Sequence, residues 1–145
     1  EYIDEEFWEK MKPERVTHLF TGGAIGICWY FHSENLINLK VLVIGKNVSN
    51  VDARTFAGLP NLTTVIFEGE TTFGECAFLN CTKLKSVTLP TGSVTLPDGV
   101  FGNCTQLEEV SGIDRLEFIH PRAFYGSSFA ISWCNNFRHP KMSVP

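Results

Sequence analysis

The sequence predicts an α/β solenoid in which short repeats stack and place a parallel β-sheet along one side. Three observations predict this fold. Phenylalanine recurs at intervals of 22, 23 and 23 residues, at Phe56, Phe78, Phe101 and Phe124. Two columns of aliphatic residues recur in register with these phenylalanines. Gly or Asn stands two positions after each Phe. A fixed period of about 20 to 50 residues indicates a repeat architecture, so the spacing decides the fold class.

The aliphatic columns predict the strands of the sheet. The first column consists of Val16, Leu39, Leu62, Leu84 and Leu107, and the second of Leu19, Leu42, Val65, Val87 and Val110. One coil cannot bury its own inward side chains, so neighbouring coils must cover them. We expect about five coils of 22–23 residues within residues 16–130, and a degenerate sixth coil from Phe129 to Trp133. Their strands would pair in parallel, about 4.8 Å apart.

A column of small polar residues predicts how each coil returns to the sheet. It consists of Asn35, Gly58, Asn80, Asn103 and Gly126. Gly and Asn adopt a left-handed backbone at low cost. We therefore expect a short helical or 3-10 turn on the convex side of each coil, ended by a residue with positive φ. An apolar residue also precedes each Phe by five positions, at Val51, Phe73, Leu96 and Ile119.

The two open ends of such a stack need covers. Residues 1–15 are expected to form an N-terminal capping helix, with Asp4 as its N-cap and Pro13 as its stop. Its apolar face would consist of Ile3, Phe7, Trp8 and Met11. Residues 131–145 depart from the repeat and are expected to form a C-terminal cap or tail.

The motif Ala-Phe-x-Asn-Cys-Thr-x-Leu-x-x-Val-x-Leu-Pro is clearest from Ala77 to Pro90. It resembles the BspA-like leucine-rich repeats, which occur mainly in surface proteins of gut and oral bacteria and of some parasitic protists. The resemblance covers roughly residues 16–130 and implies a right-handed coil with its parallel sheet on the concave side. It also implies adhesion or protein binding at the cell surface or outside the cell. Departures are Ser33 in place of Phe, Leu59 in place of Cys, and Gly112 at the end of the third strand column.

The composition argues against several other classes of protein. With 43% apolar and 19% charged residues, the chain is typical of a globular domain rather than of a disordered one. No apolar stretch reaches the roughly 18 to 20 residues that cross a bilayer, so we expect no membrane insertion within this segment. The net charge is −4 and no basic run occurs, which argues against a nucleic-acid partner.

Alternation along the strands predicts which side chains face the concave surface. If the two aliphatic columns point inward, the residues between them point outward. They form one row of His18, Val41, Thr64, Ser86 and Glu109, and another of Phe20, Val43, Ile66, Thr88 and Ser111. The N-terminal part of this face is apolar and the C-terminal part is polar. An exposed apolar patch often marks an interaction site, although the N-terminal helix, a neighbouring domain or self-association could also cover it.

The Gly-rich stretch from Thr21 to Ile27 invites an enzymatic interpretation. It is similar to the cofactor loop of short-chain dehydrogenases, in which glycines let the backbone approach a pyrophosphate. Cys28 stands where the last Gly is usual, and no Tyr-x-x-x-Lys pair occurs. A small NAD(P)-dependent oxidoreductase therefore stays only a minor alternative, and we expect no enzyme, no catalytic residue and no cofactor. The four His show no clustered spacing with Cys, so no metal site is expected.

Cys81 and Cys104 occupy one column in successive coils. Their separation would permit a disulfide, but parallel inward side chains favour two buried free thiols that pack as small apolar residues. Asn-x-Ser/Thr sequons occur at Asn47, Asn61, Asn80 and Asn103, and they would accept glycans in a eukaryotic secreted protein.

The sequence thus predicts a non-catalytic module that binds a protein or the extracellular matrix through its strand face. The main alternative is a structural spacer within a larger surface protein.

Overall fold

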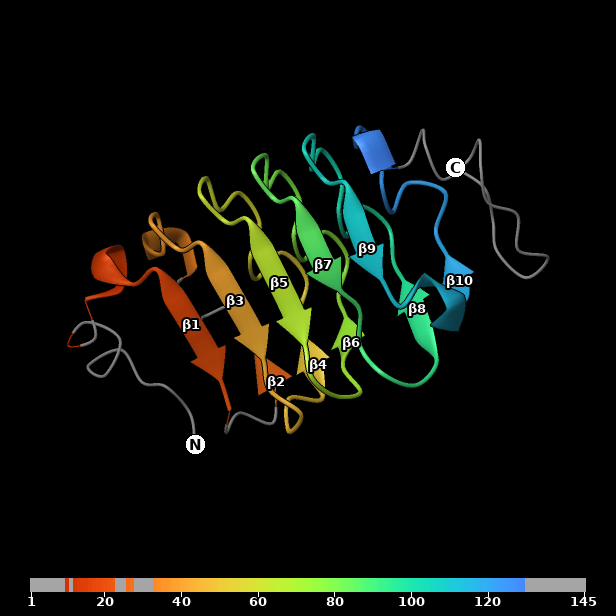
Figure 1. Ribbon diagram of the computed structural model, residues 1–145, viewed down its shortest axis with the longest axis horizontal. Coiled ribbons are helices and arrows are strands. Elements are labelled where there is room, and N and C mark those ends of the chain that lie inside the picture. The colour runs from red at the N-terminus through yellow and green to blue at the C-terminus, as the bar shows by residue number, and fades with distance from the viewer. Residues whose placement is uncertain (1–9, 11, 23–25, 28–32, 130–145) are drawn as a thin grey trace.

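The computed structural model describes residue 10 and residues 12–22, 26–27 and 33–129 of the chain. These residues wind as a solenoid of parallel strands, with one coil for each repeat (Figure 1). The predicted capping helix and C-terminal cap fall almost wholly on residues 1–9, 11 and 130–145, which lie outside the described residues. Of the N-terminal segment, Lys10 is helical and Pro13–Arg15 form the 3-10 helix η1.

The main sheet has five strands in the order β1-β3-β5-β7-β9. They are β1 (His18–Thr21), β3 (Val41–Ile44), β5 (Thr64–Phe67), β7 (Ser86–Thr88) and β9 (Glu109–Ser111), and Figure 1 shows them side by side. Every pair is parallel, and the register aligns residues of the same repeat position, as in Leu42 with Val65 and Val65 with Val87. The second predicted column is therefore confirmed as a ladder of paired residues, whereas the first column lies two residues before the start of each strand.

A second series of short strands lies on the return path of each coil. The strands β2 (Gly26–Ile27), β4 (Asn50–Val51) and β6 (Thr72–Phe73) form one sheet, and β8 (Val94–Leu96) pairs with β10 (Leu116–Ile119). The apolar column that precedes Phe by five positions belongs to these strands, because Val51 pairs with Phe73 and Leu96 with Ile119. The sequence pattern identified this column without identifying it as a strand.

The interior is a stack of repeated side chains. The rings of Phe56, Phe78, Phe101 and Phe124 are fully buried and lie in a single row. Neighbouring centroids are 5.5, 5.7 and 5.6 Å apart, with interplanar angles of 15–16°. Phe67 and Phe73 pack against this row edge-on, and Leu62, Leu84 and Leu107 are also fully buried. The coils thus share one continuous apolar core, as the repeat predicted.

The convex turns differ from the expected helical turns. A 3-10 helix, η3 (Ser33–Asn35), occurs at this position in the first described coil. In the next three coils, backbone N–H groups alternate between a partner within the coil and a partner in the next coil. Thr55 N donates to Asp52 O and Ala57 N to Arg54 O, whereas Phe56 N donates to Ala77 O. Every second bond therefore ties two coils together, and no run of consecutive helical bonds can form.

Two columns of left-handed residues shape each convex turn. The predicted column is confirmed at Gly58, Asn80, Asn103 and Gly126, whose φ angles lie between 55° and 76°. The prediction is wrong at Asn35, which is the last residue of the 3-10 helix η3 and has no positive φ. A second column at Arg54, Cys76 and Gly99 also has positive φ, and the sequence analysis missed it. The side chains of the predicted column stack as well, because Asn103 Nδ2 donates to Asn80 Oδ1 at 2.9 Å. At position 126 a Cβ would lie 2.5 Å from Asn103 Oδ1, so Gly126 leaves room for the Asn103 side chain of the preceding coil.

Replacing Asn103 with Val is expected to destabilise the fold by about 1–2 kcal/mol, because a β-branched residue tolerates positive φ poorly. The variant also loses the bond to Asn80. Urea-induced unfolding followed by circular dichroism measures the change. Asn103→Gly is the matched control, because it removes the same bond while keeping the left-handed backbone accessible. An equal loss of stability in both variants would show that the side-chain bond, and not the backbone conformation, matters.

The last described coil departs from the repeat at the end of β9. Gly112, with φ of 92°, stands where the three preceding coils have Ile44, Phe67 and Leu89, and the 3-10 helix η4 (Ile113–Arg115) follows it. The Arg115 guanidinium donates to the backbone oxygens of Leu89 and Pro90 at 3.1–3.2 Å. Arg115 thus satisfies carbonyl groups of the preceding coil. Beyond this coil, the Phe129 ring packs against Phe124 at 4.8 Å.

Candidate protein-binding surface

The structure places all ten predicted surface residues on the outer face of the main sheet. Burial alternates along β3 and β5, where Leu42, Ile44, Val65 and Phe67 point inward. The register brings the ten residues into the two predicted rows, which run across β1, β3, β5, β7 and β9. Each of the ten side chains is exposed or half-buried.

The N-terminal half of this face carries an apolar patch. Phe20, Val43 and Ile66 lie next to one another in register, and Val41 adjoins them in the other row. Phe20 is 62% exposed, whereas the three aliphatic side chains are half-buried. We call these four residues the apolar concave patch. Large apolar side chains grouped on an open sheet leave a surface that a partner can desolvate.

The C-terminal half of the face is polar. It presents Ser86, Thr88, Glu109 and Ser111, of which the last three are exposed. Ser86 Oγ donates to Thr64 Oγ1 at 3.5 Å, so the polar half begins where the apolar patch ends. The polarity of the face therefore changes along the solenoid, from apolar at β1 to polar at β9.

Hydrogen bonds at the strand entrances hold the face in place. The N–H groups of Lys40 and Val41 both donate to Thr17 O, and those of Thr63 and Thr64 both donate to Lys40 O. Thr63 Oγ1 adds a third bond to Lys40 O at 3.0 Å. A surface fixed by its backbone in this way loses little conformational freedom when it binds.

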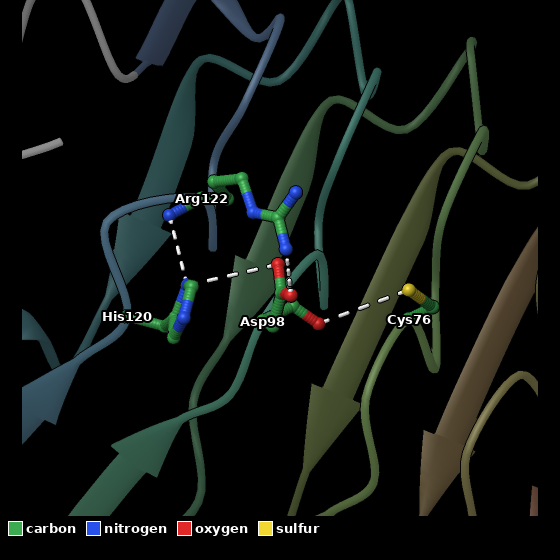
Figure 2. A network of polar contacts seen from close by, with 4 residues as sticks. All are labelled: Cys76, Asp98, His120 and Arg122. Carbon is green, nitrogen blue, oxygen red and sulfur yellow. Dashed lines mark hydrogen bonds and ion pairs between the residues drawn. The ribbon is translucent and has the colours of Figure 1, made fainter.

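A polar cluster lies on the other side of the solenoid, at the corner between the return strands and the convex turns. Figure 2 shows Asp98 between Cys76 and His120, with the Arg122 guanidinium paired to the Asp98 carboxylate. His120 Nδ1 accepts a bond from Arg122 N at 3.1 Å and lies 3.6 Å from Asp98 Oδ1. The Cys76 thiol instead faces the backbone oxygen of Asp98 at 3.8 Å.

This cluster joins coils and does not resemble a nucleophilic centre. A reactive thiol needs a base within hydrogen-bond reach, and here Asp98 separates the thiol from the imidazole (Figure 2). Asp98 and Arg122 are 24 residues apart, so the repeat brings them together. The sequence analysis missed this pair, although opposite charges one period apart were a signal that could have indicated it.

The buried thiols confirm the interpretation as packed free cysteines. Cys81 and Cys104 are fully buried and free, and their Sγ atoms donate to Phe56 O at 3.2 Å and Phe78 O at 3.3 Å. Burial raises the pKa of Cys81 to about 12 and raises that of Cys104 further. Each thiol thus satisfies a carbonyl of the preceding coil, which explains a Cys in this column.

The end of the Gly-rich stretch is a strand, whereas the end of a dinucleotide-binding loop begins a helix. Gly26 and Ile27 form β2, which pairs in parallel with β4, so this end of the stretch belongs to the solenoid. Residues 23–25 lie outside the described residues. Elsewhere in the described ranges, no group of three His, Cys, Asp or Glu side chains could hold a metal ion. None of the helices described in the structure has the length and apolarity needed to cross a membrane.

Comparison with known proteins agrees with the geometry. The family profile described as BspA type leucine rich repeat region matches residues 25–131 in six copies. The chain belongs to the BspA-type leucine-rich repeat family. The matched range contains the Phe row and the strands β3, β5, β7 and β9, whereas β1, with His18 and Phe20, precedes it. No curated protein matches the chain.

One solved structure with a TM-score above 0.5 shares the fold, and two others are similar at lower scores. A leucine rich repeat protein of T. pallidum has a TM-score of 0.53 and 22% identity, over 73% of this chain and 45% of that protein. A leucine rich cell surface protein of Faecalibacterium prausnitzii A2-165 has a TM-score of 0.47 and 22% identity, over 79% and 40%. The pneumococcal vaccine antigen PcpA has a TM-score of 0.44 and 17% identity, over 78% and 31%. The chain thus spans less than half of each of these proteins.

Proposed function

We propose that this chain is a non-catalytic binding module. Its concave strand face recognises a partner that is either another protein or a component of the extracellular matrix. The observation that carries the proposal is the apolar concave patch, in which the 62% exposed Phe20 lies in register with Val43 and Ile66. Exposed aromatic residues supply much of the binding energy at protein interfaces. The membership of the BspA-type family supports a place at the cell surface or outside the cell.

The shape of the patch fits a protein partner better than a small molecule. The patch extends over three neighbouring strands, about 10 Å across at the usual strand spacing. Small-molecule sites are pockets that enclose most of the ligand, whereas this patch lies on an open sheet surface. Its backbone is fixed by bonds between coils, so a partner meets a preformed surface.

The alternative, a structural spacer within a larger surface protein, is also supported by the architecture. Coils that pack only against their neighbours transmit a fixed spacing along the chain. The two functions differ in one measurable respect. A binding module engages a partner as an isolated chain, whereas a spacer does not.

The double substitution Val43→Lys and Ile66→Lys is expected to abolish partner binding. Two lysines would remain charged inside the interface or keep the partner away from it, since desolvating an unpaired charge is costly. The loss should exceed about 30-fold, the effect of one interface hot spot of about 2 kcal/mol. The chain is first screened against an array of extracellular and matrix proteins, and surface plasmon resonance then measures the affinity of each variant.

Thr95→Lys is the matched control, because Thr95 is exposed on β8, away from the concave face. It should leave the affinity unchanged. Circular dichroism checks that both variants stay folded. Full retention of binding by the double variant would contradict the proposed surface, and the absence of any partner on the array would favour the spacer.

The predicted helix over residues 1–15 cannot extend to residue 15, because Lys12 is left-handed and Pro13–Arg15 form the separate 3-10 helix η1. We infer in addition that the segment before Lys12 caps the first coil as a helix, and that residues 131–145 cover the last one. Val16 and Leu19 at the N-terminal end are only half-buried by the described residues and offer an apolar surface for that helix.

The coil is expected to be right-handed, because parallel crossover connections are right-handed in nearly all proteins.

A further inference from the structure

The apolar concave patch borders a rim whose charge changes sign along the solenoid. Lys40 directly precedes β3 and Lys85 directly precedes β7, and both side chains are exposed. They occupy the same repeat position two coils apart, with Thr63 between them, so their Cα atoms are separated by about 10 Å at the usual strand spacing. In the part of the chain that the structure describes, neither ammonium group pairs with a carboxylate.

The same rim is acidic at the other end of the sheet. Glu108 takes the repeat position of Lys40 and Lys85 in the last coil, and Glu109 follows it at the start of β9. Both are exposed. Lys40 therefore flanks the apolar half of the face, Lys85 stands where the polar half begins, and the two glutamates flank the far end of the polar half.

Lys40 is held near the patch by its backbone. Lys40 O accepts bonds from Thr63 N, Thr64 N and Thr63 Oγ1, which fixes the Cα next to Val41. The four-carbon stem then lets the ammonium group reach either over the patch or into solvent. At physiological salt the screening length is about 8 Å, which is shorter than the separation of the two lysines. An anionic group paired with one lysine is therefore attracted only weakly by the other. Pairing with both lysines therefore takes two separate carboxylates, one for each ammonium group.

We propose that the occupant of the apolar concave patch is a segment of a partner protein in which carboxylate side chains stand next to large apolar ones. This inference rests on the proposed function and names the chemistry of its partner. The apolar side chains would cover Phe20, Val43 and Ile66, and the carboxylates would pair with Lys40 and Lys85. Glu108 and Glu109 repel the same segment, so it lies over β1 to β7 and ends before β9.

A basic apolar segment fits the face less well. Its charges would be attracted to Glu108 and Glu109, which border serine and threonine, while its apolar groups would lie beside two lysines. Charge and apolar contact would then favour different halves of the sheet. An acidic apolar segment satisfies both over β1 to β7.

The test begins with selection of random displayed peptides on the whole chain. Peptides that also bind the V43K/I66K variant are removed, so that the remaining peptides depend on the patch. The proposal expects enriched sequences with Asp or Glu next to Leu, Phe or similar residues. One enriched peptide is then synthesised, and isothermal titration calorimetry measures its affinity for each variant.

K40E/K85E should weaken that peptide's binding by about tenfold, the combined effect of losing two exposed ion pairs and adding repulsion. Lys46→Glu is the matched control, because Lys46 is an exposed lysine beyond the opposite end of β3. It should change the affinity by less than about twofold. Higher salt should also weaken binding to the unchanged chain and have a smaller effect on K40E/K85E.

Each outcome decides between distinct claims. Enrichment of basic or uncharged apolar peptides, or equal effects of K40E/K85E and K46E, would overturn the acidic segment while leaving the patch as a binding surface. A selection that yields no peptide able to distinguish the unchanged chain from V43K/I66K would overturn the proposed function itself.

Discussion

Replacing Phe78 with Ala is expected to destabilise the fold by about 3–5 kcal/mol, the usual cost of deleting a buried phenyl ring. Phe78 is fully buried in the centre of the Phe row, with ring centroids 5.5 Å from Phe56 and 5.7 Å from Phe101. It also meets Phe67 edge-on at 6.2 Å. Its neighbours are fixed by backbone bonds between coils, so the cavity cannot easily collapse. Since natural domains are stable by only about 5–15 kcal/mol, this variant should lose much of its stability.

Urea-induced unfolding measured by circular dichroism and tryptophan fluorescence tests this expectation. Tyr125→Ala is the matched control, because it deletes an aromatic ring that lies one position after Phe124 and is 61% exposed. That variant should differ from the unchanged chain by less than about 0.5 kcal/mol, as surface substitutions usually do. Similar losses in the two variants would mean that the Phe row contributes no more to stability than an exposed ring.

The Cys81 thiol is expected to resist alkylation in the folded chain across the pH range in which ordinary thiols react. The thiolate is the nucleophile, and burial raises the pKa of Cys81 from 9.0 to about 12. At pH 9, an unshifted thiol is half ionised, whereas about one Cys81 thiol in a thousand is ionised. The reactive fraction should therefore rise only as the pH approaches 12. The surrounding side chains also exclude the reagent, which adds to the protection.

Mass-spectrometric mapping after a brief treatment with iodoacetamide gives the modified fraction at each cysteine. Cys76 is the internal control, because its side chain is partly exposed. The same treatment in urea should modify Cys81 and Cys104 as readily as Cys76. Rapid modification of Cys81 without urea would show that this column is not part of the closed core.

The repeat period predicted the parts of the fold that depend on packing between coils. A side chain that recurs every 22 or 23 residues must lie next to its equivalents, so the ladders at Leu42 and Val65 and the row through Phe78 followed from spacing alone. The outward residues of the concave face followed from the alternation of a strand. Asn103 and Gly126 were predicted to be left-handed because their residue types indicate that conformation.

Features that depend on backbone bonding could not be predicted in the same way. Arg54 and Cys76 have positive φ, but neither residue type indicates a left-handed backbone. The return strands contain two to four residues each, which is too short for alternation to identify them. The convex turns resemble helical turns in sequence, and only the alternation of bonds within and between coils distinguishes them. The partner of the concave face is a further unknown, because spacing places side chains without naming what they contact.

The alternating backbone bonds of the convex turns also determine how this family can change in size. A cut between any two of the coils that carry Phe56, Phe78, Phe101 and Phe124 exposes a similar set of donors and acceptors, since the bonds join equivalent positions of successive repeats. Duplication or loss of one whole repeat therefore restores all of these bonds without any new contact having to arise. Recombination can lengthen or shorten the molecule in steps of one coil. Each step adds or removes one strand of the main sheet, and with it the outward side chains of that strand.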